Sequence, residues 1–461
     1  MIKLKILALV TLQCLIISAK GQIISINTAD VIATNVSHKI GINMNTMRDN
    51  DANRTNARPI FEALQEMGVK HLRYPGGGKS NLYFWAQSPY TDPTTNKFLP
   101  GWYADASTGA GFKLLNFDEF MAICKHIDAI PHLNVGYNPQ AGLNEDVAAS
   151  WVKYANITKR YGVIYWEIGN EMWGSHKISA DSLVKIAKSY SKAMKAVDPT
   201  IKIGVSWNNA EGYNTLLKRC GKDIDFVTNS DYPCFTWGSY NNYNENANFD
   251  LVNDSILKLV EGNKKMVISE FNAVDWGKTF GKPNYWPNTN DHGHGMVVFE
   301  IIGQILTNRR IDYGCFWNTR WAEKDDYSVY DALDINNQLL PVAKPLMVWG
   351  KFIKDNMVSI SRTNTIVTYA CYDSISGDLN LFLSNKATTT QTVSISISSP
   401  NRYRNGSVWQ LKGSGPSITN PTWGKTGDVT ISNQSISSID LPATSITVIA
   451  ISKKGVQMLN M

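Results

Sequence analysis

Two glutamates in this chain each follow a short apolar segment of the kind that forms a buried strand. Glu171 closes the segment 166–171, and Glu270 follows the segment 267–269. A facing pair of carboxyl groups can protonate a leaving oxygen with one member, while the other attacks an anomeric carbon or activates water. One glutamate after a strand is more often a helix cap or a surface charge, but two such glutamates favour catalysis. We therefore predict that Glu171 and Glu270 cleave a glycosidic bond.

Two neighbours of Glu171 bear on its role. Glu167 lies four residues earlier, inside the predicted strand and on the same face, so we expect it deeper in the protein and farther from a substrate. Asn170 directly precedes Glu171, and its amide group could hydrogen-bond the 2-hydroxyl of a sugar. The sequence therefore favours Glu171 over Glu167 as the catalytic residue and adds Asn170 as a substrate-binding candidate.

Eight short apolar runs, most of them followed by a loop and a helical stretch, supply the elements that must position this pair. Parallel strands need crossover helices, so the pattern predicts a (β/α)8 TIM barrel, in which the carboxyl ends of strands carry catalytic groups. An open doubly wound sheet is the alternative, but the Gly76-Gly77-Gly78 run lacks the spacing of a phosphate-binding loop. The predicted strands are 39–44, 69–74, 130–135, 163–168, 201–205, 224–228, 265–269 and 313–317.

The sequence changes character after about residue 355. Segments rich in Val, Ile, Thr and Ser alternate apolar with polar residues, which is typical of an antiparallel β-sandwich. Residues 22–37 have the same character and are expected to add a strand to it. The predicted domains are therefore the catalytic barrel at 38–350 and the β-sandwich at 351–461. The sandwich could brace the barrel or bind glycan.

The N-terminal residues resemble a secretory signal peptide. Lys3 and Lys5 precede an apolar run at 6–17, and small residues follow at 19 and 21. We expect cleavage before Gln22, so residues 1–21 would be absent from a secreted or periplasmic product. No later stretch of 18 apolar residues occurs, so no membrane association is expected after cleavage.

The composition gives no sign of a nucleic-acid partner, a cofactor or a metal. The net charge is only +6 over 461 residues, and no dense run of Lys and Arg is present. His292 and His294 lack a third ligand at a supporting spacing, so we expect a loop at 283–295 to offer these imidazoles to sugar hydroxyls. Five tryptophans in predicted loops on the catalytic side could build outer sugar subsites: Trp102, Trp237, Trp276, Trp286 and Trp321.

Four motifs resemble those of the family 51 α-L-arabinofuranosidases, over roughly residues 38–350. They are Arg73-Tyr74-Pro75-Gly76-Gly77, Asn134-Val135-Gly136, the segment 166–171 that ends in Asn170-Glu171, and the helix leading to Ala196-Val197-Asp198-Pro199. Those enzymes are clan A retaining glycoside hydrolases, which combine a (β/α)8 barrel with a β-sandwich. The Asn-Glu motif is specific for the clan.

The resemblance implies a role for each candidate residue. Glu171 would be the acid/base and Glu270 the nucleophile, while Asn170 would bind substrate hydroxyls. Arg73 and Tyr232 would lie beside the nucleophile, where a guanidinium charge and a hydrogen bond would lower the pKa of Glu270. Partial burial and the negative neighbour would instead raise the pKa of Glu171, which must hold a proton. A structural salt bridge is the alternative role for Arg73.

Trp317 would form the floor of the −1 subsite, with packing at the barrel rim as the alternative for this residue and for Tyr232. The end of strand six, Asp231-Tyr232-Pro233, differs from the family's usual pattern. The predicted function is a secreted retaining glycoside hydrolase of cell-wall polysaccharide or oligosaccharide, with α-L-arabinofuranosidase as the first candidate activity. Another clan A activity (endo-glucanase, xylosidase, glucuronidase or agar-type hydrolase) and a non-catalytic glycan-binding protein are the alternatives.

Overall fold

The computed structural model describes most of the chain after the predicted signal peptide. The described ranges are 22–85, 113–175, 177–232, 254–260, 264–273, 290–320, 330–363 and 366–453. Residues 1–21 and the five loop tryptophans named above lie outside these ranges, so the predictions made for them stay predictions.

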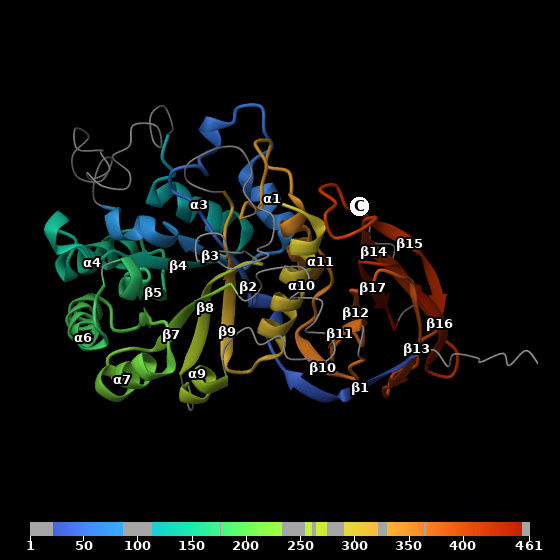
Figure 1. Cartoon of the computed structure of the whole chain (residues 1–461). Coiled ribbons are helices and arrows are strands. Elements are labelled where there is room, and N and C mark those ends of the chain that lie inside the picture. The colour runs from blue at the N-terminus through green and yellow to red at the C-terminus, as the bar shows by residue number, and fades with distance from the viewer. Residues whose placement is uncertain are drawn as a thin grey trace, which may run out of the picture.

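Eight parallel strands close into a barrel, in the order in which they occur along the chain (Figure 1). This confirms the predicted TIM barrel and excludes the open doubly wound sheet. The predicted runs differ from the strands by only a few residues, because strands buried on both faces are continuous apolar segments. The strands are β2 (Ile40–Asn43), β3 (His71–Tyr74), β4 (Ile130–Val135), β5 (Tyr165–Ile168), β6 (Lys202–Ser206), β7 (Phe226–Asp231), β8 (Lys265–Phe271) and β9 (Ile311–Phe316).

Several helices begin at polar capping residues and bury one face against the barrel. Asn116 and Glu119 form a capping box at the start of α3, and Ser179 caps α6 by accepting a hydrogen bond from the Ser182 amide. Among the helices that the structure describes, none is both long and apolar enough to cross a membrane. The α-helices are α1 (Ile60–Met67), α3 (Phe117–Ile127), α4 (Glu145–Val152), α5 (Met172–Ser175), α6 (Ala180–Val197), α7 (Ala210–Cys220), α9 (Asp254–Leu259), α10 (His292–Thr307) and α11 (Lys344–Phe352).

The second domain is a nine-stranded sheet in the order β15-β14-β17-β12-β11-β10-β1-β13-β16. All its pairs are antiparallel except β1 with β13, so the predicted fold class is confirmed with one parallel exception. The sheet folds over a core of its own, so that β16 contacts β12, β15 and β17. The strands are β1 (Gln22–Ala33), β10 (Asn356–Ile360), β11 (Ile366–Tyr372), β12 (Leu379–Asn385), β13 (Gln391–Ser398), β14 (Asn405–Lys412), β15 (Thr422–Thr430), β16 (Ser435–Leu441) and β17 (Ser445–Ile451).

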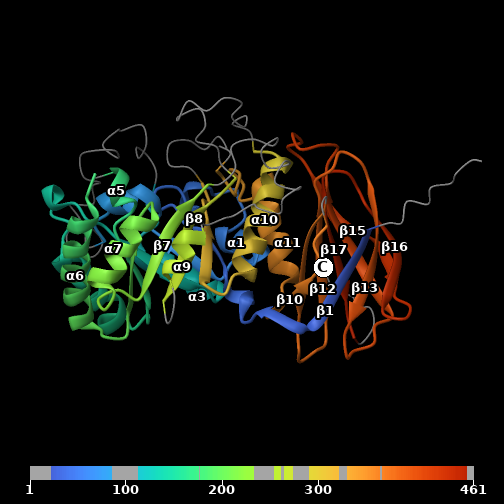
Figure 2. The ribbon, with the colours of Figure 1, turned by 60° about the horizontal axis from the view of Figure 1, so that its bottom comes forward.

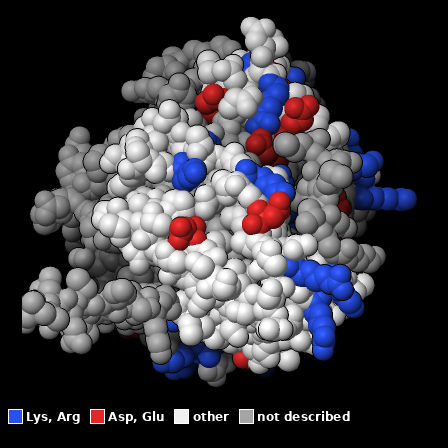
Figure 3. Space-filling view, turned by 90° about the vertical axis from the view of Figure 1, so that its right-hand side faces the viewer, with Lys and Arg blue, Asp and Glu red and all other residues white. Residues whose placement is uncertain are grey.

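The outward side of this sheet is largely uncharged. In β13 the apolar residues are buried, while Thr392, Ser396 and Ser398 are exposed. Figure 3 shows the end of the molecule formed by the sheet domain, where Lys, Arg, Asp and Glu are scattered between broad uncharged areas. Ser and Thr on the exposed face of a half-buried strand give this alternation.

Helices α10 and α11 lie between the barrel and the sheet domain (Figure 2). The Trp349 ring of α11 stacks on Phe382 of β12, with ring centroids 4.0 Å apart. His292 and His294 begin α10 and are fully buried, and His292 Nε2 lies 2.8 Å from the Thr444 carbonyl oxygen of the sheet domain. The expectation that these histidines lie in a sugar-binding loop is therefore wrong for both. Packing between the domains, which the local sequence does not reveal, buries this helix start.

Candidate active site

The carboxyl ends of five barrel strands bring the predicted residues to one mouth. Arg73 is in β3, and Glu270 is the next-to-last residue of β8. Glu171 lies three residues beyond the end of β5, while Tyr232 and Trp317 directly follow β7 and β9. Parallel strands of a barrel end on the same side, so the five positions converge there.

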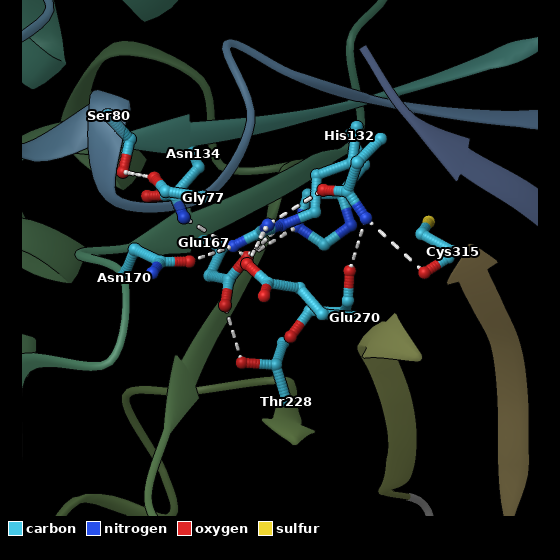
Figure 4. Close-up of polar contacts among 12 residues, drawn as sticks. Gly77, Ser80, His132, Asn134, Glu167, Asn170, Thr228, Glu270 and Cys315 are labelled. Atoms are coloured by element: carbon cyan, nitrogen blue, oxygen red, sulfur yellow. Dashed lines mark hydrogen bonds and ion pairs between the residues drawn. The ribbon is translucent and has the colours of Figure 1, made fainter. Parts of the chain in front are cut away.

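Arg73 is the centre of this arrangement. Its side chain is fully buried, and its Nε donates to Glu167 Oε2 at 2.7 Å. Nη1 donates to Asn43 Oδ1 at 2.8 Å and to Glu270 Oε1 at 3.1 Å, and Nη2 donates to Asn170 Oδ1 at 2.8 Å. Figure 4 shows the side chains of Glu167 and Asn170, from β5 and the turn after it, converging with that of Glu270 from β8. Arg73 therefore forms a structural ion pair with Glu167 and also lies beside Glu270, so it fills both of the roles that the sequence offered as alternatives.

Glu270 receives one donor on each carboxylate oxygen. Arg73 binds Oε1, and the Tyr232 hydroxyl donates to Oε2 at 2.9 Å. The pairing of β8 with β7 and with β9 is irregular around Glu270, and such bulges re-aim side chains beside active sites. The carboxylate is therefore held in one orientation while its residue is only 4 % exposed.

Glu167 is locked in its charged form and cannot serve as an acid. Burial would raise its pKa, but Arg73, His132 and the Thr228 hydroxyl together lower it to about 2. The Thr228 hydroxyl donates to Glu167 Oε1 at 2.6 Å, and His132 Nε2 lies 3.2 Å from Oε2 (Figure 4). The preference for Glu171 over Glu167 thus gains a physical reason beyond depth in the barrel.

Glu171 and Glu270 form a carboxyl pair whose pKa values are raised, whereas that of Glu167 is lowered. Burial, followed by the negative charge of Glu171, raises the pKa of Glu270 to about 7, although Arg73 and Tyr232 oppose the rise. This differs from the expectation that those two donors would lower it below its usual range. Burial also raises the pKa of Glu171. Two interacting carboxyl groups lose their protons in two steps that belong to the pair, so the pair keeps one proton close to neutral pH. The guanidinium beside Glu270 favours that proton on Glu171.

A tight turn delivers Glu171 to the mouth. Gly169 and Glu171 both adopt left-handed backbone conformations, with φ of 66° and 44°. Such a conformation is uncommon for a glutamate, and residues of this kind cluster at functional sites. A Cβ atom on Gly169 would lie 1.9 Å from Met172 Sδ, so the turn also requires glycine at that position.

Asn170 is held by hydrogen bonds to Arg73 and Asn81. Its side-chain Oδ1 accepts from Arg73. The Asn81 side chain donates to the Asn170 backbone carbonyl oxygen at 3.0 Å and accepts from the Asn170 backbone N–H at 3.2 Å. These bonds fix the backbone directly before Glu171. The side-chain contact with a sugar hydroxyl stays a prediction.

Trp317 packs closely against the segment that follows β3. A Cβ atom on Gly77 would lie 2.1 Å from Trp317 Cη2, and the φ of Gly77 is 53°, so only glycine fits beneath the ring. The buried Lys79 ammonium lies 5.4 Å from the ring centroid, and burial lowers its pKa to about 8. Trp317 is only 5 % exposed. Rim packing is therefore part of its role, and a sugar contact stays a prediction.

The sequence did not single out Asn43, His132, Thr228 or Lys79. Asn43 could have been found by the rule that revealed Glu270, because it is the last residue of β2. Thr228 and His132 lie inside β7 and β4 and carried no comparable signal. No group of three or more His, Cys, Asp or Glu that could hold a metal ion occurs within the described ranges.

The chain matches no protein-family model. Probable alpha-L-arabinofuranosidase C of Aspergillus fumigatus is 28 % identical over 186 residues, which are 35 % of this chain and 35 % of that protein. The intracellular exo-alpha-(1->5)-L-arabinofuranosidase of Acetivibrio thermocellus is 22 % identical over 281 residues, which are 56 % of this chain and 54 % of that protein. The similarity thus spans about a third of the first relative and about half of the second.

Two solved structures resemble the whole chain. The alpha-L-arabinofuranosidase from Thermotoga maritima, in complex with arabinose, has a TM-score of 0.73 at 17 % identity and covers 93 % of this chain and 99 % of its own. A xyloglucanase of glycoside hydrolase family 44 from Paenibacillus polymyxa has a TM-score of 0.66 at 14 % identity, with 94 % and 100 % covered. The chain has the fold of these enzymes. The resemblance to clan A enzymes, stated from the motifs, is confirmed.

Proposed function

We propose that this protein is an exported retaining glycoside hydrolase in which Glu270 is the nucleophile and Glu171 the acid/base. The observation that carries the proposal is the pair itself. Glu270 is buried and held by Arg73 and Tyr232, and the charge of Glu171 reaches it strongly enough to raise its pKa. A buried carboxyl pair that shares one proton is what acid-assisted glycosyl transfer requires.

In the first step a Glu270 carboxylate oxygen attacks the anomeric carbon while the glycosidic C–O bond breaks. Glu171 transfers its proton to the departing oxygen, so the leaving group departs as an alcohol. The hydrogen bonds from Arg73 and Tyr232 orient the attacking carboxylate. The negative charge on Glu270 is consumed in the ester bond, which makes Glu171 easier to ionise at the same moment.

In the second step the ionised Glu171 takes a proton from water, whose oxygen attacks the anomeric carbon. The ester bond to Glu270 breaks, its carboxylate returns to Arg73, and the sugar is released with its original configuration. Glu167 takes no part in proton transfer. Its charge holds Arg73 in place.

For the substrate we propose an arabinofuranosyl unit of a cell-wall polysaccharide or oligosaccharide. Three of the four similar proteins described above are named as arabinofuranosidases, and this supports the sugar. The similar fold of a xyloglucanase supports the alternative of another clan A activity, on xyloglucan. Export is proposed from the N-terminal residues alone.

The test is turnover on a panel of aryl glycosides and plant or algal polysaccharides, with ¹H NMR of the first anomer released. We expect cleavage of at least one arabinofuranoside with retention of configuration. Glu171→Gln should abolish turnover of natural glycans, and Glu211→Gln on the exposed face of α7 is the matched control. Release of the inverted anomer would contradict the roles assigned here. Glycan binding without turnover of any substrate would favour the non-catalytic alternative.

A further inference from the structure

A cavity of about 800 Å³ opens at the amino-terminal end of the barrel, opposite the mouth. The first residues of several barrel strands line it, and these positions are not used for catalysis in TIM barrels. Its volume lies within the range of small-molecule sites. The side chains that give it chemical character are Lys39, His71, Tyr165, Lys265, Arg309 and Asp312.

The cations of this cavity bind neutral carbonyl oxygens. Lys39 Nζ donates to the carbonyl oxygens of Asn308 and Ile311 at 2.9 and 2.8 Å. Arg309 Nη2 donates to the Val31 carbonyl oxygen at 2.7 Å, and Lys265 Nζ donates to the Arg309 carbonyl oxygen. Carbonyl groups satisfy the donors but do not cancel the charge. Among the described residues that line the cavity, Asp312 has the one carboxylate that faces Lys39, Lys265 and Arg309, so the lining is positive.

One residue of the cavity lining also carries a buried ring nitrogen that forms no hydrogen bond. His71, the first residue of β3, is 4 % exposed, and its Nδ1 forms no hydrogen bond. Its ring stacks on Tyr313 with centroids 3.6 Å apart and meets the Tyr165 ring edge-on at 5.7 Å. A buried polar atom without a partner destabilises the fold, so a hydrogen-bonding ligand at this position would recover that cost.

We propose that this cavity is a second binding site, which takes a sugar carboxylate such as a hexuronate. The positive lining binds the carboxylate, and His71 hydrogen-bonds one polar group of the ligand. The Tyr165 ring offers apolar surface to the C–H groups of a sugar. Asp312, which accepts from the Tyr165 hydroxyl at 3.1 Å, can accept from a sugar hydroxyl as well. The net positive lining favours an anion, and the Tyr165 ring beside it favours a sugar acid over an inorganic anion.

The test is isothermal titration calorimetry on the full chain with D-glucuronate, D-galacturonate, D-glucose and inorganic sulfate. We expect a hexuronate to bind and glucose to bind far more weakly. Lys265→Gln should weaken uronate binding about fivefold by removing one charge, and His71→Phe should weaken it about tenfold. Turnover at the opposite mouth should stay unchanged in Lys265→Gln.

Lys188→Gln, an exposed lysine on α6 away from the cavity, is the control for loss of one positive charge. His71 is buried, so its variant could disturb β3, but Lys265 is exposed and its variant keeps the test decisive. The proposal is overturned if no uronate binds, or if Lys265→Gln and Lys188→Gln bind uronate as tightly as the wild type. Sulfate binding as tight as uronate binding would overturn the sugar part. None of these outcomes bears on Glu171 and Glu270, so a failure here is separate from a failure of the proposed hydrolase.

Discussion

Charged side chains are buried both at the barrel mouth and at the seam between the two domains, where α10 packs against the sheet domain. The positive and negative charges balance at the seam but not at the mouth. At the seam Lys386 Nζ lies 3.2 Å from Glu300 Oε2, so a cation and a carboxylate form a buried ion pair. At the mouth Arg73 is shared by Glu167 and Glu270, and Glu171 adds a further carboxyl group. In the seam pair the two charges balance. The three carboxyl groups around Arg73 outnumber its one charge, and the Glu171–Glu270 pair keeps a proton close to neutral pH, which is the proton that the proposed mechanism uses.

The strongest way to break this comparison is to exchange a single carboxylate in each region. Glu270→Gln should lower turnover about 10⁴-fold, because the covalent step loses its nucleophile. Its melting temperature should not fall, because a buried carboxylate with a raised pKa is replaced by a neutral amide. The seam variant Glu300→Gln should do the reverse, with nearly normal turnover and a lower melting temperature. Equal loss of activity in both variants would contradict the distinction.

Removing the shared cation should damage both properties at once. Arg73→Gln leaves Glu167 and Glu270 without their charge partner, so we expect a loss of about 3–5 kcal/mol in unfolding free energy. Turnover should fall about 10²- to 10³-fold, because Glu270 loses its orienting donor. Urea denaturation and steady-state kinetics on the same preparation would measure both. Normal kinetics in a destabilised Arg73→Gln protein would reduce Arg73 to a structural ion pair.

At the seam, we expect substitutions to change the unfolding free energy through the Lys386–Glu300 ion pair, without an effect on turnover. Lys386→Met leaves Glu300 partly buried without its cation and should cost about 3 kcal/mol of unfolding free energy. The double variant Lys386→Met with Glu300→Leu should recover most of that loss, because an apolar pair can replace a buried ion pair. Thermal denaturation of the single and double variants gives the coupling. A double variant as unstable as the sum of its single changes would show that Lys386 and Glu300 are not coupled.

The smallest expected effect is a shift in the pH profile. Wild-type activity should decline as the pH rises past about 7 and the carboxyl pair loses its last proton. Glu171→Gln removes the negative charge that raises the pKa of Glu270, so Glu270 should ionise at lower pH than in the wild type. With an aryl glycoside whose leaving group needs no proton, the variant should therefore stay active at more acidic pH and lose the alkaline decline. Identical profiles would contradict the coupling.

The sequence predicts the barrel well and its contacts less well. The eight strands and the positions of Glu171 and Glu270 follow from apolar runs, because a strand buried on both faces has a local signature. The hydrogen bonds of Arg73 do not, since they join residues from β2, β5 and β8 that meet only when the barrel closes. The pKa of Glu270 likewise depends on contacts made only in the folded barrel. Its donors were named from the sequence, but the rise in its pKa depends on burial that only the fold supplies.

The start of α10 is another feature that the local sequence does not predict. The His-Gly-His-Gly stretch has the composition of a loop, and glycine is a poor helix former. The helix nevertheless begins at His292, because Asp291 caps it and the sheet domain buries it. The left-handed backbone of Glu171 and the parallel pairing of β1 with β13 likewise carry no local signal. All three features are set by packing between distant segments.

Covalent trapping tests the central claim most directly. A 2-deoxy-2-fluoro glycosyl fluoride of the sugar that the enzyme cleaves should form a slowly hydrolysed ester, and mass spectrometry of the digested protein should locate it on the peptide that contains Glu270. Glu270→Gln should show no adduct, whereas Glu211→Gln should be labelled like the wild type. An adduct on any other carboxyl group, or rapid turnover of this reagent without an adduct, would contradict the assignment of Glu270 as the nucleophile.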